Sequence, residues 1–348
     1  MKKWMGLLLA AMLLASSAMT GCTAQTDKGT LNLMTWAEYV PSEVIAAFEA
    51  ETGIKVVPTY MSTNEDMVAK LRTQKNTYDI VVCSDMFIGM MIQESGLLQE
   101  IDASKIPNLS NVEDSFRSKY FDPENKYSIP HAAYGAILAY DTARSPIEIK
   151  GYADLWDPAL ADSVVLLDDT RGVIGFTLQM LGGSVNETDA AKLEEARTTL
   201  MDLRQNVVVL DADTPHDSFL RGDAVAGYMF GSQVTAAIEG LPSVTYVYPE
   251  EGMTYGMDCY VVAHGAPNYD NAMAFLNYVL DGEISAQISC TINYINCNTA
   301  AKPFLTQEFL DNKTVNIPAE ALADAQMYLD VGDAAIIYDD IWTEFKSR

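Results

Sequence analysis

The sequence predicts an α/β fold made of two lobes that close over a ligand. Apolar strand-like runs alternate with amphipathic helical segments along nearly all of the 348 residues, which is the pattern of α/β sheets. Polar and acidic residues directly follow several of these runs, at the edge where open α/β sheets bind ligands. The chain is long enough for two lobes, and lobes joined by more than one crossing can close like a hinge.

The N-terminus has the pattern of an export signal. Lys2 and Lys3 precede a short apolar run, residues 4–18, and small residues then lead to Cys22. The run is too short and too early for a membrane-spanning helix. It resembles a bacterial lipoprotein signal, in which Cys22 becomes the lipidated first residue; a plain secretory leader is the alternative. We therefore predict a signal peptide at 1–21, a tether at 22–30, and a lipid-anchored protein on the periplasmic or extracellular face of a bacterial membrane.

The first half of the mature chain alternates between predicted strands and helices. The apolar stretch Leu31–Val40 predicts a strand, and Pro41 opens a helix that Gly53 stops. The elements that follow are strand 54–60, helix 65–74, strand 78–83, short edge pieces at 97–101 and 127–130, and strand 134–140. This alternation predicts a parallel sheet with right-handed crossovers. The extended run 134–140 is expected to cross between the lobes.

The second half repeats the α/β pattern and ends in helices. Strands are predicted at 163–167, 207–210, 224–230, 244–248 and 256–263, and helices at 171–181, 190–203, 269–280, 284–290, 320–328 and 334–345, with another starting at 231. We assign residues 31–136 and about 257–300 to lobe 1. Residues 137–256 and about 301–348 form lobe 2.

The charge favours a cationic partner. The formal net charge is −26, and so acidic a surface repels nucleic acid and anionic lipid and attracts cations. We therefore expect no nucleic-acid partner. A role of the acidic residues in solubility alone is the alternative.

The sequence offers little support for an enzyme. It has no zinc-type cysteine or histidine spacing, phosphate-binding loop or nucleophile-elbow motif, so we expect no cofactor and no metal. Cys83 and Cys259 lie in apolar runs, where a buried thiol is the usual state. One alternative stays open, a secreted thiol enzyme in which His131 or Glu38 activates Cys83 as a nucleophile.

Acidic and aromatic residues gather where the predicted strands end. The first strand ends in a polar, aromatic cluster, Trp36, Glu38 and Tyr39, and a carboxylate beside an aromatic ring suits a ligand cation. Asp258 lies inside the apolar run 257–262. A buried carboxylate is costly unless a cation or a hydrogen-bond network compensates it. These residues predict a cation-binding cleft.

Two further acids and one ring lie at strand ends. Asp85 follows strand 78–83, although it equally suits the cap of the next helix. Asp169 follows strand 163–167, with Arg171 close enough in sequence to neutralise it. Phe230 ends strand 224–230 beside polar residues, so we expect its ring to line the cleft.

Several segments resemble the spermidine/putrescine-binding proteins of ABC transporters. They occur in order from about residue 31 to 345 and include TWAEYVPSEVIAAFEAETGIKV, YDIVVCSDM, YPEEGMTYGMDCYVV and TINYINCNTAA. The resemblance implies the type II periplasmic-binding architecture, an interlobe cleft for a polyamine, and an ABC permease as partner. We expect a monomer without enzymatic activity. Another small organic cation, such as a quaternary amine or a guanidino compound, is the alternative ligand.

The family pattern also assigns ligand-binding residues. The residues that match it are Trp36, Glu38, Tyr39, Ser84, Asp169, Phe230, Asp258 and Tyr294. Asp85 is added as a replacement for the lost carboxylate, since it follows a strand end, and Tyr255 because it is adjacent to Gly256. The departures are Met86, Gly172, Gly256 and Tyr328, which stand where the family has a ring, a carboxylate, a tryptophan and an amide. We expect these departures to leave a roomier site and to decide which amine is bound.

Overall fold

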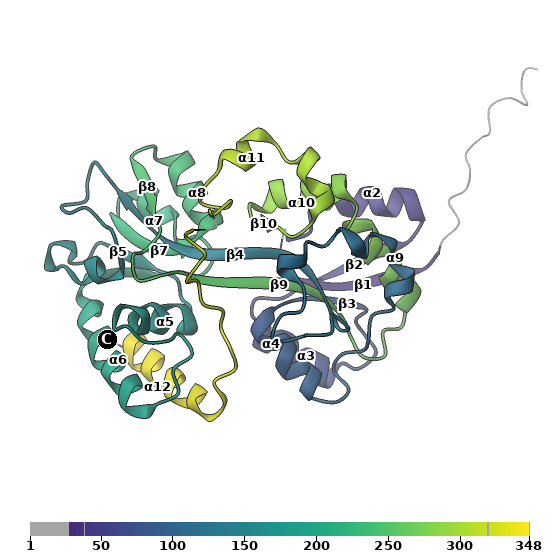
Figure 1. The fold of residues 1–348 in the computed structure, drawn as a ribbon, viewed down its shortest axis with the longest axis horizontal. Helices are drawn as coiled ribbons and strands as arrows, with labels where there is room; N and C mark the ends of the chain where they lie inside the picture. Colours follow the sequence, from purple (N-terminus) through teal and green to yellow (C-terminus); the bar gives the residue numbers. More distant parts are fainter. Residues whose placement is uncertain (1–27, 38, 319, 348) are drawn as a thin grey trace, which may run out of the picture.

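The computed structural model describes residues 28–37, 39–318 and 320–347 and contains one mixed ten-stranded sheet. The main path of the sheet runs β2-β1-β3-β9-β4-β7-β5-β6, and β8 and β10 pair with β4. Helices cover both faces, and the elements form two groups at either end of the sheet (Figure 1). The predicted signal peptide, Cys22 and Glu38 lie outside the described residues.

The first lobe begins with parallel strands. Its strands are β1 (Thr30–Thr35), β2 (Lys55–Tyr60), β3 (Ile80–Ser84) and the short β10 (Ile295–Asn296). Strand β1 pairs in parallel with both β2 and β3. Its helices are α2 (Ser42–Thr52), α3 (Asn64–Thr73), α4 (Asp85–Gln93), α9 (Tyr269–Val279) and α10 (Gly282–Ile292). Helix α2 ends as predicted at Gly53, whose φ of 77° suits a residue without a Cβ.

The second lobe has a similar plan. Its strands are β5 (Val164–Leu166), β6 (Val207–Leu210), β7 (Ala226–Phe230) and β8 (Val244–Val247). Strand β5 pairs in parallel with β6 and β7. The helices of this half and the C-terminus are α5 (Thr170–Met180), α6 (Ala190–Leu203), α7 (Asp217–Arg221), α8 (Gly231–Gly240), α11 (Gln307–Asp311) and α12 (Ala335–Ser347).

Two long strands join the lobes. Strands β4 (Ser128–Asp141) and β9 (Thr254–Val262) lie side by side through the middle of the molecule (Figure 1). They pair antiparallel, and β9 is also antiparallel to β3, as β4 is to β7. The prediction of a parallel sheet is therefore wrong for the centre, where these crossing strands run against their neighbours. The predicted lobe boundaries at 136/137 and 256/257 fall inside these two strands, and the one at about 300/301 falls in a short 3-10 helix, Thr299–Phe304; the division remains a proposal.

One local prediction is wrong. Residues 320–328 form turns and extended chain instead of a helix. Gln326 instead donates its N–H to the Met253 carbonyl and accepts from the Tyr255 N–H, both at 3.0 Å, so this segment satisfies its backbone against the start of β9. The short edge piece predicted at 97–101 is present as an antiparallel bridge between Leu98 and Ala263.

The apolar side chains form separate cores on the two faces of the sheet. In the first lobe, Phe48 and Phe275 pack on one face, and Met34 and Met67 pack on the other. The second lobe has a larger aromatic core that includes Phe176. Burial of such side chains is the main source of stability. Among the described helices, none has the length and apolar character needed to cross a membrane.

Candidate binding site

Asp258 lies at the centre of the site, on β9 between β3 and β4. It is paired in register with Ser84 on one side and Ala132 on the other. Its side chain is buried, with the residue 5% exposed. The Tyr39 hydroxyl donates to Oδ2 at 2.5 Å, and the Ser84 hydroxyl donates to Oδ1 at 2.7 Å. Burial raises the pKa of Asp258 to about 6, and these two hydrogen bonds act in the opposite direction.

Ser84 is held in place by a residue that the sequence analysis missed. Asn64, the first residue of α3, donates its Nδ2 to the Ser84 hydroxyl at 3.2 Å. Its Oδ1 accepts the Ser84 backbone N–H at the same distance. The Ser84 hydroxyl therefore accepts from Asn64 and has its own proton free for Asp258. This pairing fixes the direction in which Ser84 points.

Aromatic rings pack around this carboxylate. The Tyr39 ring lies 5.4 Å from Trp36 and 5.5 Å from Tyr294, both edge to face. Tyr134 of β4 continues the cluster, with its ring 5.8 Å from Tyr294 and 5.3 Å from Phe230. The structure thus brings four predicted rings together and adds Tyr134. Sequence reasoning missed Tyr134 because it lies in an apolar strand that reads as core.

Asp85 is a second buried acid near the first. It begins α4, is 3% exposed, and accepts the backbone N–H groups of Met86 at 2.7 Å and Met257 at 3.2 Å. Burial raises the pKa of Asp85 to about 8, and the charge of Asp258 adds to this effect. Among the described residues, no cation lowers the pKa of either acid. Two buried carboxylates without a cationic partner suit a positively charged ligand.

Asp169 and Arg171 lie in the second lobe, outside the contacts around Asp258, and the role of Asp169 in ligand binding stays a prediction. Asp169 caps α5, accepting the Arg171 backbone N–H at 3.0 Å, and burial raises the pKa of its carboxyl group. The Arg171 guanidinium reaches the other lobe, where Nη1 lies 3.6 Å from Sδ of Met86. Nearby, the Tyr120 hydroxyl donates to the Tyr328 carbonyl at 2.5 Å. These contacts join the two lobes.

The space expected at two of the departures is filled. At Gly256, an added Cβ would lie 2.6 Å from the Tyr134 ring, so this ring occupies the place beside the strand. At Gly172, an added Cβ would lie 2.7 Å from Oδ2 of Asp169. Neighbouring side chains therefore occupy the space directly beside these two glycines, and the effect of the departures on the size of the ligand site stays a prediction.

Tyr255 and Cys83 point away from this arrangement. Tyr255 is an odd number of residues from Asp258, so its side chain leaves the opposite face of β9; its role in ligand binding stays a prediction. Cys83 is fully buried in the apolar core on that face, and burial raises the pKa of its thiol well above the usual value. A thiol in such surroundings is a poor nucleophile.

Comparisons with known proteins identify the class. A family model for bacterial extracellular solute-binding proteins matches residues 43–316. The spermidine/putrescine-binding periplasmic protein of Escherichia coli K12 is 37% identical over 350 residues, covering 100% of this chain and 99% of that protein. The chain therefore belongs to the bacterial extracellular solute-binding protein family, which serves transport. Its resemblance to the spermidine/putrescine-binding proteins, predicted from the sequence motifs, is confirmed.

Solved structures agree with this assignment. The spermidine/putrescine ABC transporter substrate-binding protein of Streptococcus pneumoniae superposes with a TM-score of 0.82 at 29% identity, covering 92% of this chain and 99% of that one. The Tp0655 (TpPotD) lipoprotein of Treponema pallidum gives a TM-score of 0.84 at 28% identity, covering 92% and 100%. The predicted two-lobed type II periplasmic-binding fold is confirmed.

Proposed function

We propose that this chain captures a polyamine, such as putrescine or spermidine, and delivers it to an ABC permease. The observation that carries the proposal is Asp258, a buried carboxylate without a cationic partner among the described residues. The carboxylate accepts hydrogen bonds from the Tyr39 and Ser84 hydroxyls and lies within a cluster of aromatic rings. An ammonium group supplies the missing charge, and the rings pack on the alkyl chain of the amine and on its charge.

Capture proceeds by closure of the lobes. Asp258 and Asp85 belong to the first lobe and Asp169 to the second, so a ligand with two separated ammonium groups can join both. The closed state then gains contacts that the open state lacks, and binding shifts the population toward it. The contacts from Arg171 to Met86 and from Tyr120 to Tyr328 support such closure. The ligand-binding roles of Trp36, Glu38, Phe230, Tyr255 and Tyr294 belong to this proposal.

The protein acts outside the cytoplasm, anchored by a lipid on Cys22. The small residues before Cys22 support this location, as does the lipoprotein of Treponema pallidum, whose fold is similar. We further propose that the protein works as a monomer.

A binding experiment tests the function directly. The purified protein is titrated with putrescine, spermidine, amino acids and sugars while its thermal stability is followed. A polyamine at roughly 100 times its dissociation constant adds about 2.7 kcal/mol of stability. Asp258→Ala abolishes the shift, whereas Asp202→Ala, which removes an exposed carboxylate from α6, preserves it. A shift with sugars or anions alone contradicts the proposal.

The ring cluster favours one second candidate, a binding protein for a quaternary amine or guanidino compound. Tyr134 restores an aromatic surface beside Gly256, so the site is richer in rings than the sequence motifs indicate. Aromatic cages recognise quaternary ammonium groups through cation–π attraction. Choline and arginine in the same screen separate this candidate from the polyamine, because a shift with either of them and none with putrescine or spermidine favours the second candidate.

A further inference from the structure

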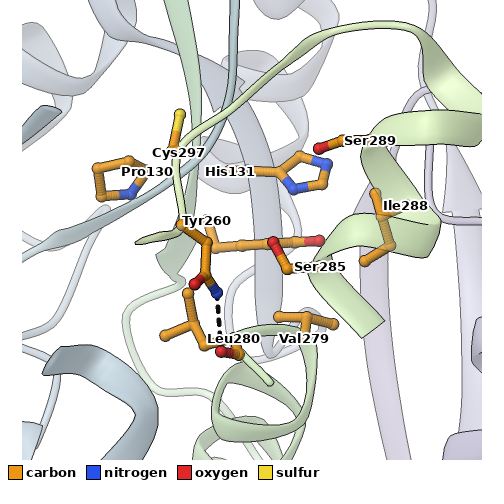
Figure 2. Close-up of a pocket in the computed structure, with 10 residues that line it drawn as sticks. Pro130, His131, Tyr260, Val279, Leu280, Ser285, Ile288, Ser289 and Cys297 are labelled. Carbon is orange, nitrogen blue, oxygen red and sulfur yellow. Dashed lines mark hydrogen bonds between the residues drawn. The ribbon is translucent and has the colours of Figure 1, made fainter. Parts of the chain in front are cut away.

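A small cavity lies behind the binding site in the first lobe (Figure 2). Strands β4 and β9 and helices α9 and α10 contribute to its wall. It has about 10 Å³ of space for the centre of a water-sized sphere, close to the roughly 10–15 Å³ that one water molecule needs. Its lining residues are Pro130, His131, Tyr260, Val279, Leu280, Ser285, Ile288, Ser289, Cys297 and Asn298. The cavity is thus large enough for one water molecule.

Two polar atoms in the cavity lack a hydrogen-bond partner within the described part of the chain. They are Nε2 of His131 and the hydroxyl of Tyr260, on residues that are 9% and 1% exposed. Their rings lie 4.4 Å apart between centroids. Figure 2 shows both side chains beside the hydroxyl groups of Ser285 and Ser289. Buried polar groups without partners are rare in folded proteins, and ordered water is the usual partner where the site is polar.

The hydrogen bonding of His131 fixes which nitrogen carries the proton. Burial lowers the pKa of His131 to about 4, so its imidazole is neutral near pH 7. An interaction with the Tyr39 backbone raises the pKa of His131 and so opposes part of this effect, which suits a ring N–H that donates to the Tyr39 carbonyl. Since Nε2 has no partner, Nδ1 is this donor. Nε2 is left as an acceptor that faces the cavity.

We propose that the cavity holds one ordered water molecule and that His131 is a positioning residue for Tyr39. The water donates to Nε2 of His131 and accepts from the Tyr260 hydroxyl, and its second hydrogen reaches the Ser285 or Ser289 oxygen. This arrangement satisfies both unpartnered atoms with three hydrogen bonds, a normal number for a buried water. The water also keeps the imidazole proton on Nδ1, and the Nδ1–H group then donates to the Tyr39 carbonyl.

The link to the ligand site runs through Tyr39. The His131 ring packs edge to face against the Tyr39 ring at 5.1 Å, and the Tyr39 hydroxyl donates to Asp258. A backbone contact and a ring contact from one side chain therefore set the position of that hydroxyl. This last step rests on the proposed function, because it matters only if Asp258 binds the ligand.

A double-mutant cycle tests the positioning role. His131→Leu is expected to weaken spermidine binding by about fivefold, the effect of one lost hydrogen bond, while His264→Leu, at an exposed histidine, leaves it unchanged. His131→Gln restores affinity, because an amide keeps one donor and one acceptor. In a Tyr39→Phe background, His131→Leu has little further effect, since the hydroxyl it positions is gone. Equal losses in the two backgrounds, or no loss in the wild type, overturn the role.

A ligand-free measurement tests the water and the tautomer separately. The ¹⁵N shifts of His131 at pH 7 are expected to show a protonated Nδ1 and an unprotonated Nε2. Tyr260→Phe changes the Nε2 shift, because the water loses its donor. A proton on Nε2, or no response to Tyr260→Phe, overturns the proposal even if His131→Leu fails to fold. If the wild type binds no polyamine, the proposed function fails, but this measurement still decides whether the cavity holds the water molecule.

Discussion

Tyr39 and Asp258 are 219 residues apart in the chain, and the hydroxyl of one donates to the carboxylate of the other at 2.5 Å. Tyr39 lies in the loop between β1 and α2, whereas Asp258 lies on a strand that joins the lobes. The bond ties the first loop of the chain to the centre of the sheet. It also aligns a carboxylate that has no cation of its own among the described residues.

Removal of the Tyr39 hydroxyl is expected to weaken ligand binding. Tyr39→Phe keeps the ring and its packing but deletes a hydrogen bond to a charged group, which contributes about 1.5–3 kcal/mol. The dissociation constant for spermidine therefore rises roughly tenfold or more, as measured by calorimetry. Tyr60→Phe, at a residue 58% exposed, is the matched control. Unchanged affinity in Tyr39→Phe contradicts the role of this bond.

The stability of the ligand-free protein is expected to fall as the pH rises from about 4 to 8. Burial raises the pKa of Asp258 to about 6 and that of Asp85 to about 8, from a usual value of 3.8. The folded state then holds protons that the unfolded state has released, so stability declines across this window. Urea denaturation at several pH values measures the decline.

Single variants and added ligand separate the contributions of Asp258 and Asp85 to the pH dependence of stability. Asp258→Asn is expected to reduce the lower part of this decline and Asp85→Asn the upper part, because each removes one carboxyl group. The stabilisation by added spermidine has the opposite trend and grows as the pH rises from about 5 to 8, because first Asp258 and then Asp85 ionises. A wild-type stability that matches Asp258→Asn at every pH is the contradicting result.

Gly256→Ala is expected to destabilise the protein through Tyr134. The new methyl group would lie 2.6 Å from the Tyr134 ring, and such overpacking costs about 1–3 kcal/mol. The cost should largely disappear in a Tyr134→Ala background, which opens the space. Gly89→Ala is the control, since its nearest contact would be an ordinary 3.6 Å. A cost that is the same in both backgrounds argues against this packing.

Cys83→Ala is expected to leave polyamine binding within about twofold of the wild type. Its thiol is buried on the face of the sheet away from Asp258, so the loss is one of packing, roughly 1–2 kcal/mol of stability. Calorimetry gives the affinity, and product analysis after long incubation tests for turnover. A product that disappears with Cys83→Ala would establish the thiol-enzyme alternative.

Cys22→Ala is expected to release the protein from the membrane. A lipid on Cys22 carries wild-type protein into the detergent phase of a phase-separation assay, and its mass includes the acyl chains. The variant should partition into the aqueous phase while binding spermidine normally. Wild-type protein that is aqueous and of unmodified mass identifies a plain secretory leader instead.

The centre of the site was accessible from the sequence because polar residues interrupt apolar runs there. Asp258 stands out inside an apolar run, and Tyr39 and Ser84 lie at or next to the ends of predicted strands. Their convergence depends on strand order, which the alternation of elements predicts only in part. The antiparallel course of β4 and β9 escaped prediction, since a buried strand reads alike in either direction.

Residues that act by filling space or by orienting other side chains have no distinctive pattern in the sequence. Tyr134 looks like core until the strand opposite places Gly256 beneath its ring. Asn64 reads as an ordinary start of a helix, although it orients Ser84. The helix predicted at 320–328 failed because backbone bonds from Gln326 to β9 compete with helical ones. In each case the deciding partner is distant in sequence.

The two crossing strands have a consequence for recombination and for protein engineering. Each lobe is assembled from separate stretches of the chain, and β4 and β9 belong to both. No single cut therefore yields an autonomous half, and exchanging one contiguous half with a relative would split both strands. New amine preferences are more accessible through point changes around Asp258 than through the exchange of modules.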